Sequence, residues 1–183
     1  MTDASQDMDI RTMLSEPSRM EQGFRLLMQR YGKVIYWHIR RIVVSHEDAE
    51  DALQETAVKI FRGIDSYRGE GKLTTWIYRI ATNEALNILR KRAGLFHSID
   101  SLSPQLLSTL ESQASVDADK VVTALQKAIL SLPTQQRIVF NMRYYDELSY
   151  EEIAEATGKN VGALKANYHY AYEKVKKYLQ ENL

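Results

Sequence analysis

Chain breakers are rare, and that scarcity constrains the fold more than any other feature of the sequence. Among 183 residues there are only 8 Gly and 3 Pro, too few for the frequent turns of an all-β sandwich. Apolar residues recur mainly three and four positions apart, which is the spacing of an amphipathic helix. The sequence therefore predicts an all-α chain, long enough for one large domain or two small ones.

Charge and composition exclude several classes of protein. The 24 Lys and Arg residues balance 24 Asp and Glu residues, so the chain is not a basic, histone-like sheath for DNA. With 44% hydrophobic and 26% charged residues it has the composition of a globular protein. Because it contains no cysteine, disulfides, thiolate metal sites and cysteine nucleophiles are excluded, and a reducing compartment is indicated.

Neither export nor membrane insertion is expected. The chain begins with Asp3, Asp7 and Asp9 where a signal peptide would carry basic residues and then an apolar run. No span approaches the roughly 18 consecutive apolar residues of a membrane helix. We therefore expect a cytoplasmic protein.

Residues 1–97 are predicted to form a first domain of three helices. The first spans residues 24–44, although its last three residues alone, Ile-Val-Val, would also suit a strand. Ser45 and Asp48 form a capping-box pattern that opens the second helix. A glycine-rich loop at residues 63–72 precedes the third helix, which ends near Arg92.

The apolar periodicity of the second and third helices predicts which faces are buried. On the third helix the predicted core residues are Trp76, Ile77 and Ile80. The second helix is predicted to bury a stripe of Ala49, Leu53, Ala57, Ile60 and Phe61. The polar residues that the period places on another face of the third helix are Thr75, Arg79, Thr82, Asn83 and Arg90.

Residues 98–119 are predicted to be a flexible acidic linker. They include no Lys or Arg, whereas aspartate, glutamate and serine are frequent. The leucines of this segment allow two interpretations: a short helix that packs on a partner, or a tether with no favoured shape. These leucines are Leu102, Leu106, Leu107 and Leu110.

Residues 120–183 are predicted to form a second domain that contains a helix-turn-helix. Pro133 favours the start of a new helix after one that runs from Val121. Ser149 and Glu152 make a second capping box, and Gly158 suits a left-handed turn before the last helix. The predicted buried face of that last helix is Val161, Leu164, Tyr168, Ala171, Val175 and Tyr178.

The start of the last helix is a candidate DNA-reading surface, because this part of a helix-turn-helix enters the major groove. An ordinary helical hairpin is the alternative, since short capped helices joined by a glycine form those too. The candidate contact residues are Lys159, Asn160, Gly162, Ala163, Lys165, Ala166, Asn167 and His169.

A second candidate surface for nucleic acid lies at the loop before the third helix. Tyr67 and Arg68 in the loop and Trp76 on the helix combine aromatic rings with a cation. Single strands are held in this way, because bases stack on rings while cations follow the phosphates. The alternative is that these aromatic side chains belong to the core.

The second helix is strongly acidic, with five carboxylates from Glu47 to Glu55. A solvated acidic face is one interpretation, and a docking face for a basic protein is another. We expect no metal site, because only His38 offers an obvious further ligand. The sequence has no phosphate-binding glycine loop, Ser-His-Asp grouping or H-E-x-x-H motif, so we do not expect an enzyme.

Three segments together resemble bacterial RNA polymerase sigma factors of the extracytoplasmic-function group, which belong to the sigma-70 family. Residues 48–61 (DAEDALQETAVKIF) and 67–92 (YRGEGKLTTWIYRIATNEALNILRKR) resemble the family's second region. Residues 132–175 (LPTQQRIVFNMRYYDELSYEEIAEATGKNVGALKANYHYAYEKV) resemble its fourth region. The resemblance implies a transcription initiation factor that binds core polymerase, directs it to promoters and assists promoter melting.

The resemblance also implies roles for named residues. The acidic helix would dock on the β′ clamp helices of polymerase through Asp48, Asp51, Gln54 and Glu55. The nontemplate strand of the −10 element would lie near Tyr67, Arg68, Trp76, Arg79 and Asn83. The helix-turn-helix would read the −35 element and touch the β flap, and the acidic linker would run through the RNA exit path. An anti-sigma factor is an implied partner; no cofactor or small-molecule substrate is implied.

One departure from the family concerns the recognition helix. Family members commonly carry several arginines there, whereas this chain has Lys165 followed by Ala166 and Asn167. Base readout by Asn160 or Asn167, or readout of DNA shape, is therefore expected to carry more of the specificity.

Two other functions stay open on the sequence. A dimeric helix-turn-helix regulator that binds duplex operators unaided predicts a stable homodimer and a palindromic site. A metal-dependent nucleic-acid hydrolase that uses the carboxylates of residues 47–55 predicts cleavage that depends on a divalent metal.

Overall fold

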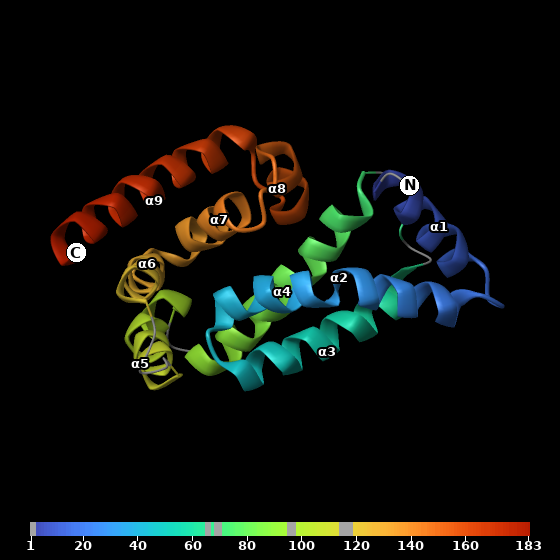
Figure 1. The fold of residues 1–183 in the computed structure, drawn as a ribbon, viewed down its shortest axis with the longest axis horizontal. Coiled ribbons are helices and arrows are strands. Elements are labelled where there is room, and N and C mark those ends of the chain that lie inside the picture. Colours follow the sequence, from blue (N-terminus) through green and yellow to red (C-terminus); the bar gives the residue numbers. More distant parts are fainter. Residues whose placement is uncertain (1–2, 65–66, 68–70, 95–97, 114–118) are drawn as a thin grey trace.

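The computed structural model describes residues 3–64, 67, 71–94, 98–113 and 119–183. Throughout these residues all regular structure is helical, without a strand, so the all-α prediction is confirmed. The N-terminal helix and the C-terminus lie at opposite ends of the molecule (Figure 1). In this described part, no helix is both long and apolar enough to cross a bilayer.

The first domain contains the three predicted helices and one more. They are α2 (Met20–Val43), α3 (His46–Gly63) and α4 (Leu73–Ala93), preceded by α1 (Asp3–Ser15). The end of α2 is helical through Val43, and the chain turns at Val44 with a φ of 67°. Helix α1 was not expected; it packs on α2 through the buried side chains of Ile10 and Leu14.

The buried stripe of α3 differs from the predicted one. Ala49 and Ile60 are buried as expected, but Phe61 is 38% exposed. The fully buried positions of α3 are Ala49, Ala52, Thr56 and Ile60, in steps of three and four residues. Thr56 is accommodated because its hydroxyl donates to the Ala52 carbonyl oxygen at 2.6 Å.

On α4 the prediction that Thr75 and Thr82 lie on an exposed face is wrong, because both are buried. Helix α4 is covered from two sides, by α2 and α3 of its own domain and by α8 (Tyr150–Thr157) of the second domain. The Thr82 hydroxyl donates to the Tyr78 carbonyl oxygen at 2.7 Å and also bonds Nε2 of His38 at 2.9 Å. Arg79, Asn83 and Arg90 are exposed, as expected.

Of the two interpretations of the leucines in the acidic segment, helix or shapeless tether, the structure shows a helix over residues 99–113. A 3₁₀ helix, η2 (Ile99–Leu102), leads into α5 (Ser103–Gln113). Leu102 and Leu106 are buried in the core of the first domain, and Leu107 and Leu110 pack against it. The surface that receives this helix therefore belongs to the same chain.

The second domain consists of α6 (Lys120–Leu130), α7 (Thr134–Tyr144), α8 and α9 (Val161–Asn182). Both hydrogen bonds of the predicted capping box at Ser149 and Glu152 are present. Gly158 ends α8 in the left-handed conformation with a φ of 69°, as predicted. On α9 the buried residues are Leu164, Ala171 and Val175, and the other predicted members of that face are half-buried.

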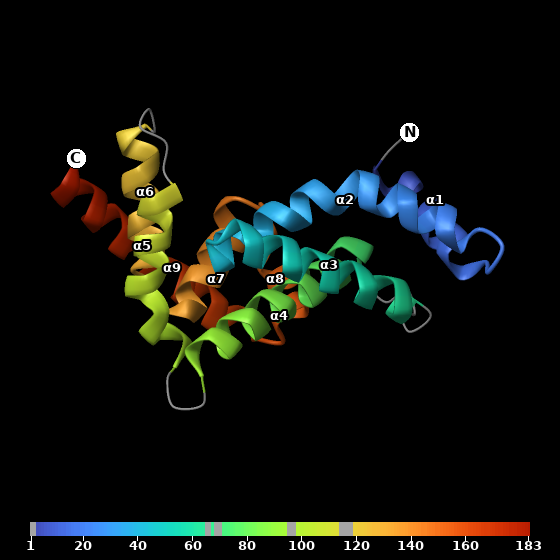
Figure 2. The ribbon, with the colours of Figure 1, turned by 90° about the horizontal axis from the view of Figure 1, so that it is seen from below.

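The two domains pack directly against each other. Figure 1 shows α7, α8 and α9 above α2 and α4, and Figure 2 shows the same proximity from below, with α5 and α6 at one end. Tyr78 of α4 is a buried member of the core cluster formed by α7, α8 and α9. The second core is thus completed by a side chain of the first domain.

Candidate polymerase and nucleic-acid interfaces

The acidic face of α3 is positioned by the N-terminal cap of that helix. Ser45 accepts a hydrogen bond from the Asp48 backbone nitrogen, and Ala49 and Ala52 anchor the opposite face in the core. Asp51, Gln54 and Glu55 are exposed, while Asp48 is half-buried and accepts from Nη1 of Arg92 at 2.5 Å. The four predicted residues line one surface cavity of about 330 Å³.

The acidic face of α3 offers negative charge to a basic partner. In the described part of the chain, no three His, Asp or Glu side chains are placed to hold a metal ion. His38, the one further ligand considered from the sequence, is fully buried away from the acidic face and bonded to Asp146 and Thr82.

Around the second candidate surface, Tyr67 is held by three contacts. Its hydroxyl donates to the Gly71 carbonyl oxygen at 2.8 Å, and its ring centroid lies 5.3 Å from that of Trp76. The guanidinium of Arg11 lies 5.1 Å from the Tyr67 ring centroid. Partial burial raises the pKa of the Tyr67 hydroxyl. Arg68 lies outside the described residues.

The structure brings Tyr67 and Trp76 together and places Arg79 and Asn83 further along the same helix, α4. Nε of Arg79 donates to the Glu155 carbonyl oxygen at 3.1 Å, whereas Asn83 is exposed. Trp76 is half-buried and packs against the first core, so part of the alternative interpretation, a core role, holds for this ring.

Sequence reasoning missed three cations beside Tyr67. Tyr67 lines a cavity of about 700 Å³, whose wall also includes the cations Arg11, Arg30 and Lys72 and the carboxylates Asp7 and Glu152. Arg11 comes from α1, the helix that was not expected. The only sequence signal for α1 was the four-residue spacing of Ile10 and Leu14.

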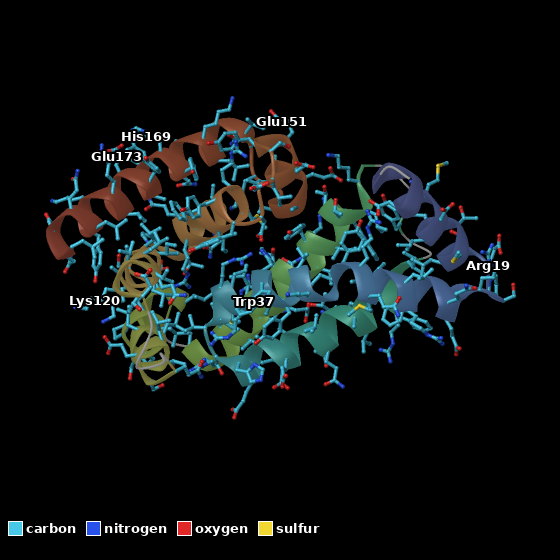
Figure 3. The ribbon with its side chains drawn as sticks, viewed as in Figure 1. Arg19, Trp37, Lys120, Glu151, His169 and Glu173 are labelled. Atoms are coloured by element: carbon cyan, nitrogen blue, oxygen red, sulfur yellow. The ribbon has the colours of Figure 1, made fainter. Side chains whose placement is uncertain are left out.

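The predicted reading surface of the helix-turn-helix is at the start of α9. Its predicted residues are all exposed except Asn167, which is half-buried. Figure 3 shows His169 on the outer edge of α9, turned away from α7. The exposed residues are Lys159, Asn160, Gly162, Ala163, Lys165, Ala166 and His169.

Asn160 has a structural task in this helix. Its side-chain oxygen accepts from the Ala163 backbone nitrogen at 2.7 Å and so caps α9. Lys165 lies with its ammonium 5.7 Å from the Tyr150 ring centroid. The amide oxygen of Asn160 is therefore already engaged, which leaves Asn167 as the better candidate for base readout.

Comparison with known proteins agrees with a chain of two helical domains, the second with a helix-turn-helix. The family model of Sigma-70 region 2 matches residues 27–94, which hold most of α2 and all of α3 and α4, and that of Sigma-70 region 4 matches residues 123–175. The ECF RNA polymerase sigma factor SigW of Bacillus subtilis is 30% identical over 185 aligned positions, which cover 96% of this chain and 99% of SigW. The chain belongs to the extracytoplasmic-function group of the sigma-70 family.

Two solved structures of other proteins have the same fold as this sigma factor. CnrH in complex with the cytosolic domain of CnrY superposes with a TM-score of 0.72 at 18% identity, covering 97% of this chain and 99% of CnrH. RpoE of Bartonella quintana, in complex with the anti-sigma factor NepR, gives a TM-score of 0.68 at 19% identity. That comparison covers 86% of this sigma factor and 96% of RpoE.

Proposed function

We propose that this sigma factor recruits core RNA polymerase to promoters and supports strand opening without catalysis of its own. The observation that carries the proposal is the presence, in one chain and in this order, of region 2 with an exposed acidic helix and region 4 with an exposed helix-turn-helix. Asp48, Asp51, Gln54 and Glu55 are the proposed contacts to the β′ clamp helices.

Promoter DNA is proposed to contact two separate surfaces. Tyr67, Trp76, Arg79 and Asn83, with Arg68 next to Tyr67 in the sequence, are assigned to the nontemplate strand of the −10 element. Stacking on aromatic rings and pairing of phosphates with cations support this assignment. The exposed start of α9 is assigned to the −35 element, where it would also lie close to the β flap.

The free energies of strand melting and base stacking favour a polymerase subunit over a regulator that acts alone. Melting about ten base pairs costs about 14 kcal/mol at roughly 1.4 kcal/mol per step. Each stacked base returns only about 1 to 3 kcal/mol, so a few captured bases do not offset the melting. A protein of zero net charge also gains little from counterion release on free DNA.

Run-off transcription with purified core polymerase and genomic promoter fragments tests the proposal. We expect discrete transcripts only when this sigma factor is added. A failure to bind core polymerase, or binding without any transcript, would refute it. A gel shift that shows tight, sequence-specific binding by the isolated chain would favour the stand-alone regulator instead.

The proposal of an anti-sigma partner is based on two similar solved structures. RpoE of Bartonella quintana was solved with its anti-sigma factor, and CnrH with a domain of CnrY. By analogy, we infer that a protein of this kind holds the present chain inactive.

A further inference from the structure

Helix α1 lies outside the segment that the region 2 family model matches, which begins at residue 27. It nevertheless packs on α2, and its residues Asp7 and Arg11 form part of the wall of the cavity that Tyr67 lines. Figure 2 shows α1 beside the start of α2, at the end of the molecule away from α5 and α6. Helix α1 therefore brings side chains to the proposed strand site that the matched part of region 2 does not supply.

The position of α1 depends on a glycine in α2. A Cβ added to Gly23 would lie 2.9 Å from the Cβ of Met13 and 3.0 Å from the backbone nitrogen of Leu14. The two helices therefore cross more closely than a larger residue at this position would allow. Ile10 and Leu14 are buried in the first core, so Arg11 is carried by a helix that is anchored to the rest of the domain.

Four of the five charged side chains in the cavity wall are paired with one another. Nε of Arg30 lies 3.4 Å from Oδ1 of Asp7, and Nζ of Lys72 donates to Oε1 of Glu152 at 2.7 Å. Arg11 is the fifth, and within the described part of the chain it has no carboxylate partner. The wall therefore carries an excess of one positive charge, which Arg11 supplies.

Asp7 is engaged by α2 rather than by Arg11. Besides its ion pair with Arg30, it accepts a hydrogen bond from the hydroxyl of Tyr31. Burial and this hydrogen bond raise the pKa of Tyr31 to about 12, so the ring stays neutral at physiological pH. The carboxylate of Asp7 thus has two partners on α2, and the charge of Arg11 is left for a ligand.

The ring of Tyr67 holds Arg11 without consuming its hydrogen bonds. The guanidinium lies 5.1 Å from the ring centroid, and a cation over a ring is held by the electrons of the ring face. The N–H donors of an arginine in this position can pair with a phosphate. Because phosphates follow bases that stack on aromatic rings, a strand held at Tyr67 and Trp76 would bring a phosphate within reach of Arg11.

We propose that Arg11 binds a phosphate of the nontemplate strand beside Tyr67, so that α1 is part of the strand-binding site of this sigma factor. This inference rests on the proposed function, because Tyr67 and Trp76 are among the residues assigned to that strand. Arg11 adds affinity that is independent of base sequence, since a phosphate contact carries no sequence information.

The test measures binding of the holoenzyme to a labelled promoter fragment whose −10 region is kept unpaired by mismatches. The fragment is taken from a promoter that gives a run-off transcript, and fluorescence anisotropy is recorded at several salt concentrations. We expect Arg11→Gln to bind about fivefold more weakly than the wild type, the upper range for one exposed ion pair. The slope of log affinity against log salt should fall by about 0.7, the value for one phosphate of a single strand.

The salt slope distinguishes a phosphate contact from a packing role. Arg11→Lys keeps the charge and should keep the wild-type slope. If Arg11 served only to cover Tyr67, Arg11→Gln would weaken binding without changing the slope, and that result would overturn the proposal.

Arg19→Gln is the matched control, because it removes the same charge from an exposed position that does not line the cavity. Figure 3 shows Arg19 at the tip of the turn between α1 and α2, at the outer end of the molecule. Its affinity and salt slope should equal those of the wild type. An equal loss in Arg11→Gln and Arg19→Gln would indicate a general charge effect and would also overturn the proposal.

Tyr67→Ala separates this inference from the proposed function. If Tyr67→Ala binds the unpaired fragment as tightly as the wild type, the strand assignment fails and the role of Arg11 fails with it. If Tyr67→Ala is impaired but Arg11→Gln keeps both affinity and slope, the role of Arg11 alone is refuted. Weaker assembly of Arg11→Gln with core polymerase would assign Arg11 to the polymerase instead, which also contradicts the proposal.

Discussion

His38 and Asp146 are separated by 108 positions in the sequence and joined by a hydrogen bond of 2.7 Å between Nδ1 and Oδ2. The imidazole is fully buried, and its other nitrogen bonds the Thr82 hydroxyl. The carboxylate of Asp146 in the second domain is thereby bonded to α2, and His38 links it in turn to Thr82 of α4.

Replacing Asp146 with alanine tests how much this contact stabilises the protein. His38 and Arg41 would lose their shared acceptor in a buried setting, so the free energy of unfolding should fall by about 3 kcal/mol. Urea denaturation followed by circular dichroism measures the change. Asp51→Ala, at an exposed position, should stay within about 0.5 kcal/mol of the wild type; a similar loss in both variants would contradict the assignment.

Asp100 joins the interdomain segment to α7 and predicts a dependence of stability on pH. Its carboxylate accepts from the Thr134 backbone nitrogen at 2.7 Å and from the Thr134 hydroxyl at 2.5 Å. The side-chain hydrogen bond from Thr134 is the main cause that lowers the pKa of Asp100 below 3.8. Because the folded pKa is lower than the unfolded one, the stabilisation is present above pH 3.8 and is lost as the pH falls through the folded pKa.

Asp100→Ala should therefore lower the free energy of unfolding by about 1 kcal/mol at neutral pH, the usual value for a helix cap. The difference from the wild type should shrink below about pH 4. Urea titrations at several pH values measure it. A difference that persists unchanged in acid would show that the carboxylate charge is not responsible.

Asp51→Lys tests the docking face. Asp51 is exposed and lies off the buried stripe of α3, so the fold should be retained while charge repulsion weakens association with core polymerase by about tenfold. Surface plasmon resonance with immobilised core enzyme measures the affinity. Glu173→Lys, the same reversal of charge on the exposed edge of α9 (Figure 3), should bind normally; normal binding by Asp51→Lys would refute the assignment.

Asn83→Ala tests the strand site. Asn83 is exposed on α4 and is not among the residues that line the cavity of the docking face, so association with core polymerase should be unchanged while promoter opening falls by about fivefold, as for a lost polar contact. Permanganate footprinting of unpaired thymines reports the opening. Wild-type footprints from this variant would remove Asn83 from the proposed site.

Asn160 separates a capping role from a base-reading role. Asn160→Ser keeps a side chain that can cap α9, whereas Asn160→Ala removes the cap at a cost of about 1 kcal/mol. If capping is its task, Asn160→Ser should bind −35 duplexes like the wild type in a gel shift with holoenzyme. A loss of sequence preference in Asn160→Ser would instead assign Asn160 to base readout.

Local chemistry explains which features could be predicted from the sequence. The helix-turn-helix was predictable because Ser149, Glu152 and Gly158 act within a few residues of their own backbone. The prediction of the buried stripe of α3 was partly wrong because Thr56 is polar and yet buried. Its hydroxyl bonds a carbonyl oxygen of its own helix, and a pattern of apolar residues does not reveal such a bond. Helix α1 was missed since only Ile10 and Leu14 mark it.

Contacts between the domains had no sequence signal. Asp146 reads as an ordinary loop residue, and nothing near it indicates that His38 is its partner. Likewise Arg79 was expected to lie near DNA, and only the packing of α8 on α4 shows that Lys72 and Arg79 bond Glu152 and Glu155. Such pairings depend on the relative placement of two domains, which a local pattern does not encode.

The position of Tyr78 has a consequence for anyone who divides this protein into halves. A fragment that starts after α5 would retain α6 to α9 but lose the Tyr78 ring, which belongs to the same core cluster as Ile138, Leu148 and Ile153. Those side chains would then face water, and the fragment would be prone to self-association. The second core thus extends into α4, well upstream of the point where the polypeptide passes from one sigma region to the next.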